Sequence, residues 1–488
     1  MISPALREFG RNGRNPAPAA LAALAALGAG AIAAASGFVI GDPAPIVIGI
    51  AGLLGATLVV LDADWALGAL AVFVVLHLAE VASDFHGAPS LFLPLTGAIL
   101  FGVAVRWTLT GERPASAASA LLLVGTYVLV AIGSLLLSTG AASAVGTAMA
   151  LGKDAMVAVL AGLLLGRASS LRVVVWAMVG AGGFLAAISV FQFLTGSFDS
   201  SFAGFGLSSM ENIVGTYDDI RISGPLGDPN FYGQLLVVVL PLALDRMWSE
   251  KTLGLRVIGA AASALVAAAT VLTFSRGAAL AMIAVLAMMA FIYRPSIRSI
   301  AAVAVVGVMA IPFMPPGYLD RLTTLTEVGT VQGSTDASIR GRTAEITAGW
   351  LMFTDRPLTG VGYGLYDEHY QEYVSGLGIE MRSEARDAHS LYLEVAAETG
   401  IPGIIAMGAV IIGAFLALQR GRRRLDELGL AEYARIARAL TASLVGFLIT
   451  GLFLHLDFAR LFWLLIGLAL AIPTIATRES AARTGTLA

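Results

Sequence analysis

The sequence has no cysteine among its 488 residues, which excludes disulfides, thiolate nucleophiles and cysteine-ligated metal sites. It is also poor in charge, since only 13% of the residues are Asp, Glu, Lys or Arg, and the net charge is -3. Charge so nearly balanced does not favour a nucleic-acid partner, and we expect none. None of the five histidines is spaced from other ligands as a metal site requires, so we predict neither a metal nor another cofactor.

Hydrophobic residues make up 57% of the chain, and its mean hydropathy is +0.84. A lipid bilayer is the natural solvent for such a composition, and only helices satisfy the backbone of spanning segments like these. We predict an all-α polytopic integral membrane protein with about 12 to 14 spans of roughly 20 residues each. The apolar runs lie near 17–40, 44–61, 63–82, 90–107, 118–137, 145–166, 171–196, 230–245, 256–274, 277–293, 299–314, 402–418, 437–455 and 460–477.

The basic residues concentrate in alternate connections between these runs, which sets the orientation by the positive-inside rule. The connections rich in basic residues carry Arg106, Arg113, Arg167, Arg172, Arg246, Lys251, Arg256, Arg294, Arg298, Arg420, Arg422, Arg423 and Arg424. We therefore expect both termini in the cytoplasm and two long segments, 197–229 and 315–388, on the outer side.

Four segments follow from this topology. They are N-terminal transmembrane helices (1–196), an outer loop with the central helices (197–314), a large outer loop with short amphipathic helices (315–401) and C-terminal transmembrane helices (402–488). In the large loop, Ile339, Ile346, Trp350 and Phe353 share one helical face, which is typical of a helix lying along the membrane surface.

Arg221 begins the polar run Arg221–Asn230, which directly precedes a predicted span. Pro229 fits the first helical turn and Asp228 is placed to cap it. An Arg beside the free N–H groups of a helix N-terminus forms an anion site. The alternative is a capped helix start with an Arg that extends to the interface.

Arg276 lies in a very short outer connection, Phe274-Ser275-Arg276-Gly277, between two spans. A charge held at membrane depth is costly without a partner and is therefore a functional candidate, with an interfacial anchor as the alternative. Arg340 and Arg342 are candidates for binding phosphate or anionic lipid head groups, or else are ordinary surface charges.

His389 stands at the start of the helical pattern that leads back into the membrane. Its proton affinity near neutral pH suits a group that accepts a proton from an acceptor hydroxyl, although a lone histidine is more often structural. Glu394 and Glu398 follow on the same helix, and for both a structural role ranks above catalysis.

The ordered set of these motifs resembles the O-antigen ligase and polymerase family over roughly residues 150–470. The set comprises Arg221–Asn230, Phe274–Gly277, Arg342 with Trp350, Pro357–Gly362, Ala388–Glu394 and Glu398–Gly403. The chain departs from the family at Ser390, where Asn often follows the His, and at Asp228, where Asn is common.

The resemblance implies a GT-C-like, metal-independent glycosyltransferase in the bacterial inner membrane, with its active site facing the periplasm or exterior. It implies a glycan donor linked to undecaprenyl diphosphate, a lipid or glycan acceptor, and membrane lipids as surroundings, as in lipopolysaccharide or exopolysaccharide synthesis. In this scheme Arg221, Arg276, Arg342 and Arg340 bind the diphosphate and His389 activates the acceptor hydroxyl. Asp228, Asn230, Glu398 and Tyr392 support them.

Attack opposite the diphosphate leaving group predicts inversion of the anomeric centre. Ligase and polymerase share this donor chemistry, and we favour the ligase because the outer loop and the His389 helix are the better-defined parts. A secondary transporter is the alternative of another class, although it predicts matching halves and charges at mid-membrane. A membrane scaffold leaves the ordered Arg and His positions unexplained.

Overall fold

The computed structural model describes residues 62–111, 117–138, 141–214, 217–294, 337–375, 386–456 and 459–484. The predicted spans near 17–40, 44–61 and 299–314 lie outside these residues. Within them, ten helices are long and apolar enough to cross a membrane, or eleven if one bent pair counts as a single span. The prediction of an all-α polytopic membrane protein is confirmed.

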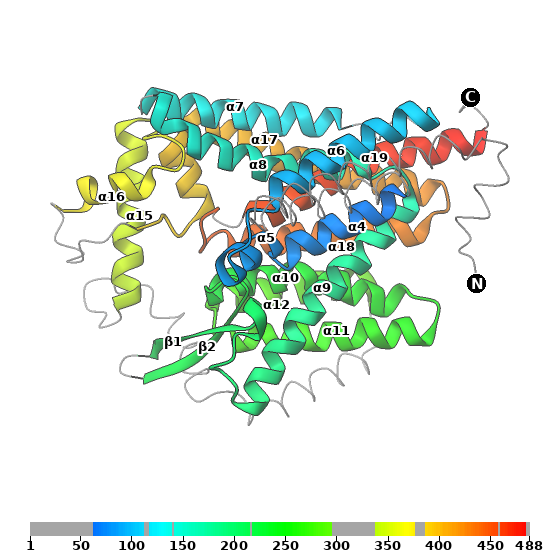
Figure 1. Ribbon diagram of the computed structural model, residues 1–488, viewed down its shortest axis with the longest axis horizontal. Helices are drawn as coiled ribbons and strands as arrows, with labels where there is room; N and C mark the ends of the chain where they lie inside the picture. Colours follow the sequence, from blue (N-terminus) through cyan, green and yellow to red (C-terminus); the bar gives the residue numbers. More distant parts are fainter. Residues whose placement is uncertain are drawn as a thin grey trace, which may run out of the picture.

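The long helices run alongside one another, and α15 crosses their ends at a steep angle (Figure 1). The bundle comprises α6 (Phe92–Thr110), α7 (Ala118–Ser138), α8 (Ala141–Leu164), α9 (Ala168–Thr195), α10 (Pro229–Ser249), α11 (Leu253–Leu272), α12 (Arg276–Tyr293), α17 (Leu391–Glu427), α18 (Ala431–Thr450) and α19 (Ala459–Thr484). We call the end of the bundle with α15 the α15 end. The C-terminal part of α19 lies at the opposite end (Figure 1).

Helices α10 and α19 form the centre of the bundle. Of their most apolar 18-residue windows, 89% and 83% of the residues are buried. Consecutive residues Val237, Val238 and Val239 are all fully buried, so α10 is covered on every side, as expected of a helix that is apolar all round. Helices α9, α11, α12 and α18 pack around α10, while α8 and α17 pack against α19.

The run predicted as a continuous span over 63–82 is broken. Helix α4 (Ala63–Val75) is followed by α5 (Leu78–Glu80) and the π-helical turn η1 (Val81–Phe85), with a bend of 68°. His77 adopts the left-handed conformation at the break, with φ of 50°. Composition predicts the length of such a run but carries no signal for this bend.

Segment 197–229, which the sequence predicts only as an outer loop, contains a β-hairpin. Strands β1 (Leu207–Val214) and β2 (Tyr217–Gly224) pair antiparallel, with Ser209 opposite Arg221, after the short 3-10 turn η2 (Phe202–Gly204). The hairpin lies towards the α15 end (Figure 1). It leads directly into α10, so the strand that carries Arg221 is anchored to the central helix.

The amphipathic helix predicted in the large loop is α15 (Ala337–Asp355), which is followed by α16 (Tyr366–Val374). Ile346 and Trp350 are 55% and 58% exposed, whereas Ala348 and Met352 on the other side are fully buried. Helix α15 thus leaves an apolar face uncovered at the span ends, and its position along a membrane surface stays a prediction.

Candidate functional site

Arg221 is almost entirely buried, at 2% exposure, and joins three elements at the α15 end. Its Nε donates to the backbone carbonyl of Thr273 at 2.9 Å, and its Nη2 donates to Oδ1 of Asn230 at 3.1 Å. Strand β2, the first turn of α10 and the connection between α11 and α12 therefore meet on one guanidinium group.

Asp228 caps α10 as the sequence predicts. Its Oδ1 accepts hydrogen bonds from the backbone N–H groups of Asn230 at 2.6 Å and Phe231 at 3.1 Å, and Pro229 occupies the first helical position. The cap fixes the start of α10 and with it the position of Asn230. Asn230 in turn accepts the hydrogen bond that orients the Arg221 guanidinium.

Arg276 is the first residue of α12 and is partly exposed. The turn before it is tight, since Phe274 adopts a left-handed backbone with φ of 53° and Ser275 caps the helix through Ala278 N at 3.4 Å. Thr273, which Arg221 binds, belongs to the same turn. Arg221 is thus bonded to the connection that carries Arg276, beside the N-termini of α10 and α12, where helix dipoles favour anions.

His389 lies just before α17, with the strained φ of 43° that non-glycine residues rarely adopt. Its side chain is 36% exposed, and its Nε2 lies 4.0 Å from Oε2 of Glu345 in α15. Glu345 is 1% exposed and also accepts a hydrogen bond of 2.8 Å from Nη1 of Arg386. Burial lowers the pKa of His389, an effect that Glu345 opposes and that His455 and Arg342 reinforce.

His455, in the connection between α18 and α19, links the histidine to the arginine side of the site. Its ring centroid lies 5.5 Å from that of His389 and 5.0 Å from that of Phe231, the residue after Asn230. Its Nε2 is 3.6 Å from Oδ2 of Asp387. The first turn of α10 thus contacts His455, and His455 in turn contacts His389.

Glu398 and Glu394 both accept hydrogen bonds from backbone N–H groups. Glu398 is 3% exposed, and its Oε1 accepts from the N–H of Tyr366, the first residue of α16, at 3.3 Å. Glu394 accepts through Oε2 from the N–H of Leu456 at 2.7 Å, beside His455. Tyr392 is 41% exposed and donates its hydroxyl to the carbonyl of Leu448 at 2.8 Å.

The glycine-rich turn after α15 packs onto a break in α17. Gly400 has a φ of 63° inside that helix, and Ile401 N donates to the carbonyl of Pro357 at 2.8 Å. A Cβ on Gly400 would lie 2.6 Å from that oxygen, and one on Gly360 would lie 2.2 Å from the Glu398 backbone, so neither position has room for a side chain. Gly400 therefore interrupts α17 where the turn after α15 packs against it.

Arg342 and Arg340 both lie in α15. Arg342 is partly exposed and close enough to His389 to lower the pKa of that imidazole. The side chain of Arg340 lies outside the described residues. Arg342 therefore joins the His389 side of the site.

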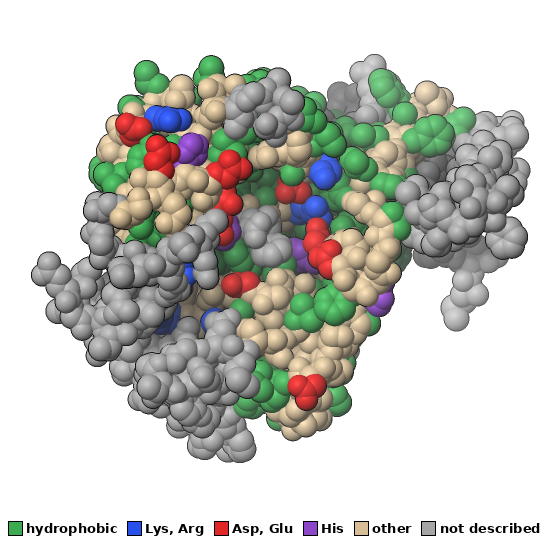
Figure 2. All heavy atoms as spheres, turned by 60° about the vertical axis from the view of Figure 1, so that its left-hand side comes forward, with side chains coloured by type: hydrophobic (Ala, Val, Ile, Leu, Met, Phe, Trp, Pro, Cys, Tyr) green, Lys and Arg blue, Asp and Glu red, His purple; other side chains and the backbone are tan. Residues whose placement is uncertain are grey.

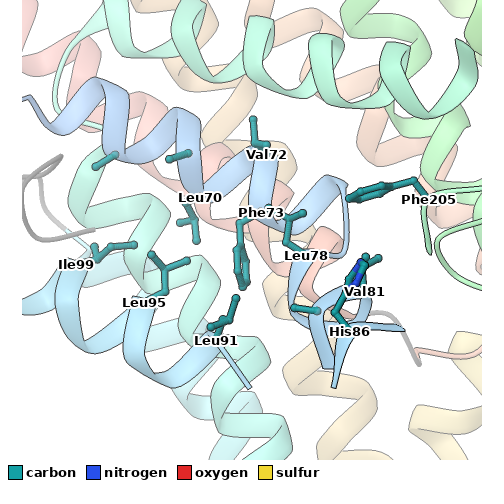
Figure 3. A pocket seen from close by; sticks show the side chains of 13 residues that line it. Leu70, Val72, Phe73, Leu78, Val81, His86, Leu91, Leu95, Ile99 and Phe205 are labelled. Carbon is teal, nitrogen blue, oxygen red and sulfur yellow. The ribbon is translucent and has the colours of Figure 1, made fainter. Parts of the chain in front are cut away.

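Charged and histidine side chains surround a hollow in the face of the molecule at the α15 end (Figure 2). A different cavity, of 530 Å³, lies between α4, η1 and α6, with Phe205 at its edge (Figure 3). Its lining is apolar apart from His86, so it lacks the groups that group-transfer chemistry needs. The α15 end is therefore the candidate site.

The sequence indicated Arg221, Arg276 and His389 as site residues, but not Glu345, Arg386 and His455. Glu345 lies three residues after Arg342 in an amphipathic pattern, where an acidic residue is usually solvated. His455 pairs with Asp387 across a long stretch of chain, and no local pattern predicts a contact between residues so far apart.

Comparison with known proteins gives one positive finding. Residues 261–408 match the family model described as O-Antigen ligase. The matched region includes Arg276, α15, α16 and His389. No curated protein matches the chain.

Proposed function

Residues 261–408 match the O-antigen ligase family, and from this premise we propose that the chain transfers a glycan from undecaprenyl diphosphate to an acceptor hydroxyl. The family is one of membrane glycan-transferring ligases and polymerases. The observation that carries the proposal is the meeting of the Arg276 turn, Arg221 and the His389–His455 pair at one end of the bundle.

The reaction needs positive charge where the diphosphate leaves. Arg276 is partly exposed at the N-terminus of α12 and contacts the diphosphate in this proposal. One guanidinium group can donate hydrogen bonds to two phosphate oxygens at once. Arg221 is too buried for a broad contact; it holds the turn and adds its charge from behind. Arg340 and Arg342 extend the anion site along α15.

The transfer is a single displacement. The acceptor oxygen forms a bond to the anomeric carbon while the bond from that carbon to the phosphate oxygen breaks, which inverts the centre. The hydroxyl proton passes to His389, whose lowered pKa keeps the imidazole neutral and able to accept it near neutral pH. Undecaprenyl diphosphate leaves as the anion, and Arg276 and Arg221 neutralise it without a metal ion.

The α15 end faces the outer side of the bacterial inner membrane in this proposal. The basic cluster Arg420–Arg424 lies towards the end of α17 that is distant from His389, which the positive-inside rule places in the cytoplasm. The exposed Ile346 and Trp350 of α15 then lie at the outer interface, near the lipid carrier.

The test uses purified protein with an undecaprenyl-diphosphate oligosaccharide and an outer-core lipid acceptor. We expect released undecaprenyl diphosphate and a glycosylated lipid with inverted linkage, and neither with His389→Gln. If the carrier-linked glycan becomes longer when no lipid acceptor is present, the chain is a polymerase. Intact donor under all conditions, with glycan moved across vesicles, would replace the transferase by a transporter.

A further inference from the structure

Glu345 is a deeply buried carboxylate at the α15 end whose second oxygen faces the site. Its Oε1 accepts the hydrogen bond from Arg386, and its Oε2 has no hydrogen-bond partner among the described residues. Nε2 of His389 lies 4.0 Å from this second oxygen. This is an ion-pair distance, and it shortens to a hydrogen bond with a small ring movement once the imidazole is charged.

The surrounding structure fixes Glu345 from both sides. Tyr366, at the start of α16, donates its hydroxyl to the backbone carbonyl of Glu345. Arg386 approaches from the segment that leads to His389, so the same segment carries the imidazole and the group that orients its carboxylate partner. A buried carboxylate with one unpaired oxygen is costly unless that oxygen serves a partner.

The other groups around His389 do not replace Glu345. His455 and Arg342 lower the pKa of His389, as burial does, and so disfavour the imidazolium. Asp387 favours it, but this residue is 53% exposed and pairs with His455 at 3.6 Å. Among the described groups that act on His389, Glu345 is the buried anion.

We propose that Glu345 is a positioning residue for His389, holding the imidazole through Nε2 and stabilising the imidazolium formed during transfer. The inference rests on the proposed function for the identity of the proton donor. The acceptor hydroxyl gives its proton to the His389 imidazole, whose side chain is 36% exposed. The imidazolium that forms directs its Nε2–H at Oε2, and Glu345 stays ionised throughout.

A second pair of the same kind supplies a matched control. His369 Nδ1 lies 3.1 Å from Oε2 of Glu372 on α16, but Glu372 is 63% exposed, whereas Glu345 is buried. Glu372→Gln removes a carboxylate beside a histidine at the same end of the protein without touching the site. An exposed pair of this type contributes little.

The test compares Glu345→Gln, Glu345→Asp and Glu372→Gln in the full-length protein. For Glu345→Gln we expect kcat for transfer to fall about tenfold or more, since a general base contributes ~10²–10⁴-fold and its orienting group only part of that. KM for the lipid-linked donor stays unchanged. The acid limb of the pH profile moves down by about one pH unit, because the anion that favours imidazolium is gone. Glu345→Asp retains the charge and part of the activity.

A direct titration separates this inference from the proposed function. The His389 resonance, assigned by its loss in His389→Gln, is followed by NMR in isotope-labelled protein with and without Glu345→Gln. A downward shift of its titration midpoint in Glu345→Gln, and not in Glu372→Gln, supports the pair even if the donor tested is the wrong one. An unchanged His389 midpoint and pH profile in a folded Glu345→Gln protein overturns the inference, whatever the transfer assay gives.

Discussion

The Nε of Arg221 lies 2.9 Å from the carbonyl oxygen of Thr273, and this bond joins strand β2 to the turn that carries Arg276. The two arginines that the sequence separates by more than fifty residues therefore share one structural unit. Their burial differs sharply, since Arg221 is 2% exposed while Arg276 is partly exposed. Substitutions at the two positions should have different consequences.

We expect Arg221→Lys to lower both transfer and stability, and Arg276→Lys to lower transfer alone. The ammonium group of lysine cannot donate hydrogen bonds to Thr273 and Asn230 in the geometry of the planar guanidinium. Arg221→Lys therefore leaves a buried acceptor unpaired, at a cost of about 1–3 kcal/mol. Thermal unfolding in detergent and the donor-cleavage assay measure the two effects. Equal melting temperatures for both variants would contradict the anchoring role of Arg221.

The close contact of Gly400 with Pro357 predicts a steric effect within one helix. Gly400→Ala adds a Cβ 2.6 Å from the Pro357 oxygen at a backbone with φ of 63°, so it should destabilise the protein and disturb the His389 segment. Gly408 lies further along α17, where an added Cβ would meet nothing within 4 Å, and is the matched control. Gly408→Ala should leave the melting temperature unchanged or raise it slightly. A similar loss in both variants would show that helix packing in general, not the break, is responsible.

The spans could be predicted because each is an apolar run whose burial in lipid depends on composition alone. Arg276 and His389 could be predicted as site residues because they are polar and stand where an apolar span begins. The break at His77 and the β1–β2 hairpin had no such signal, since both depend on contacts with distant elements.

Glu345 shows most clearly what the sequence alone does not reveal. Its neighbours Arg342 and Ile346 place it on an amphipathic helix, where an acidic residue is expected to meet water. Its burial comes from Tyr366 and Arg386, which lie 21 and 41 residues away in the chain. Non-local packing of this kind has no periodic signature, so the buried carboxylate beside His389 emerges only from the fold.

Transfer should depend on pH through His389. Burial lowers the pKa of this imidazole below its ordinary value of about 6.5, against the opposing effect of Glu345. The base must be neutral to accept a proton, so kcat/KM should be level near pH 7 and fall as the pH drops through the lowered pKa. In His389→Gln the residual activity should lack this acid limb.

The same shift affects stability in the same direction. The folded state binds fewer protons than the unfolded state between the folded and unfolded pKa values of His389. Its contribution to stability is therefore present above the unfolded pKa and is lost as the pH falls through that window. Thermal unfolding of wild type and His389→Gln as a function of pH measures this difference; parallel curves would mean that His389 does not titrate with a lowered pKa.

Arg460 at the start of α19 holds two carboxylates from other helices. Its Nε donates to Asp154 of α8 at 2.8 Å, its Nη1 pairs with Glu80 of α5, and its guanidinium stacks 4.6 Å from the ring centroid of Phe92. Asp154 and Glu80 are 21% and 32% exposed, so Arg460→Met should leave two poorly solvated anions together. Removing one partner of such a cluster is more damaging than removing all of it.

We therefore expect Arg460→Met to lower the melting temperature by a few degrees, since a loss of about 1 kcal/mol shifts it by ~2–4 °C in a domain of 150–250 residues and by less in a longer chain. Adding Glu80→Gln and Asp154→Asn to Arg460→Met should recover much of that loss, because no anion then remains uncompensated. Arg438→Met removes an arginine from a more exposed pair with Asp426, at 3.1 Å, and should change little. If the triple variant melts lower than Arg460→Met, the cluster stabilises the bundle through its hydrogen bonds and packing rather than through charge compensation.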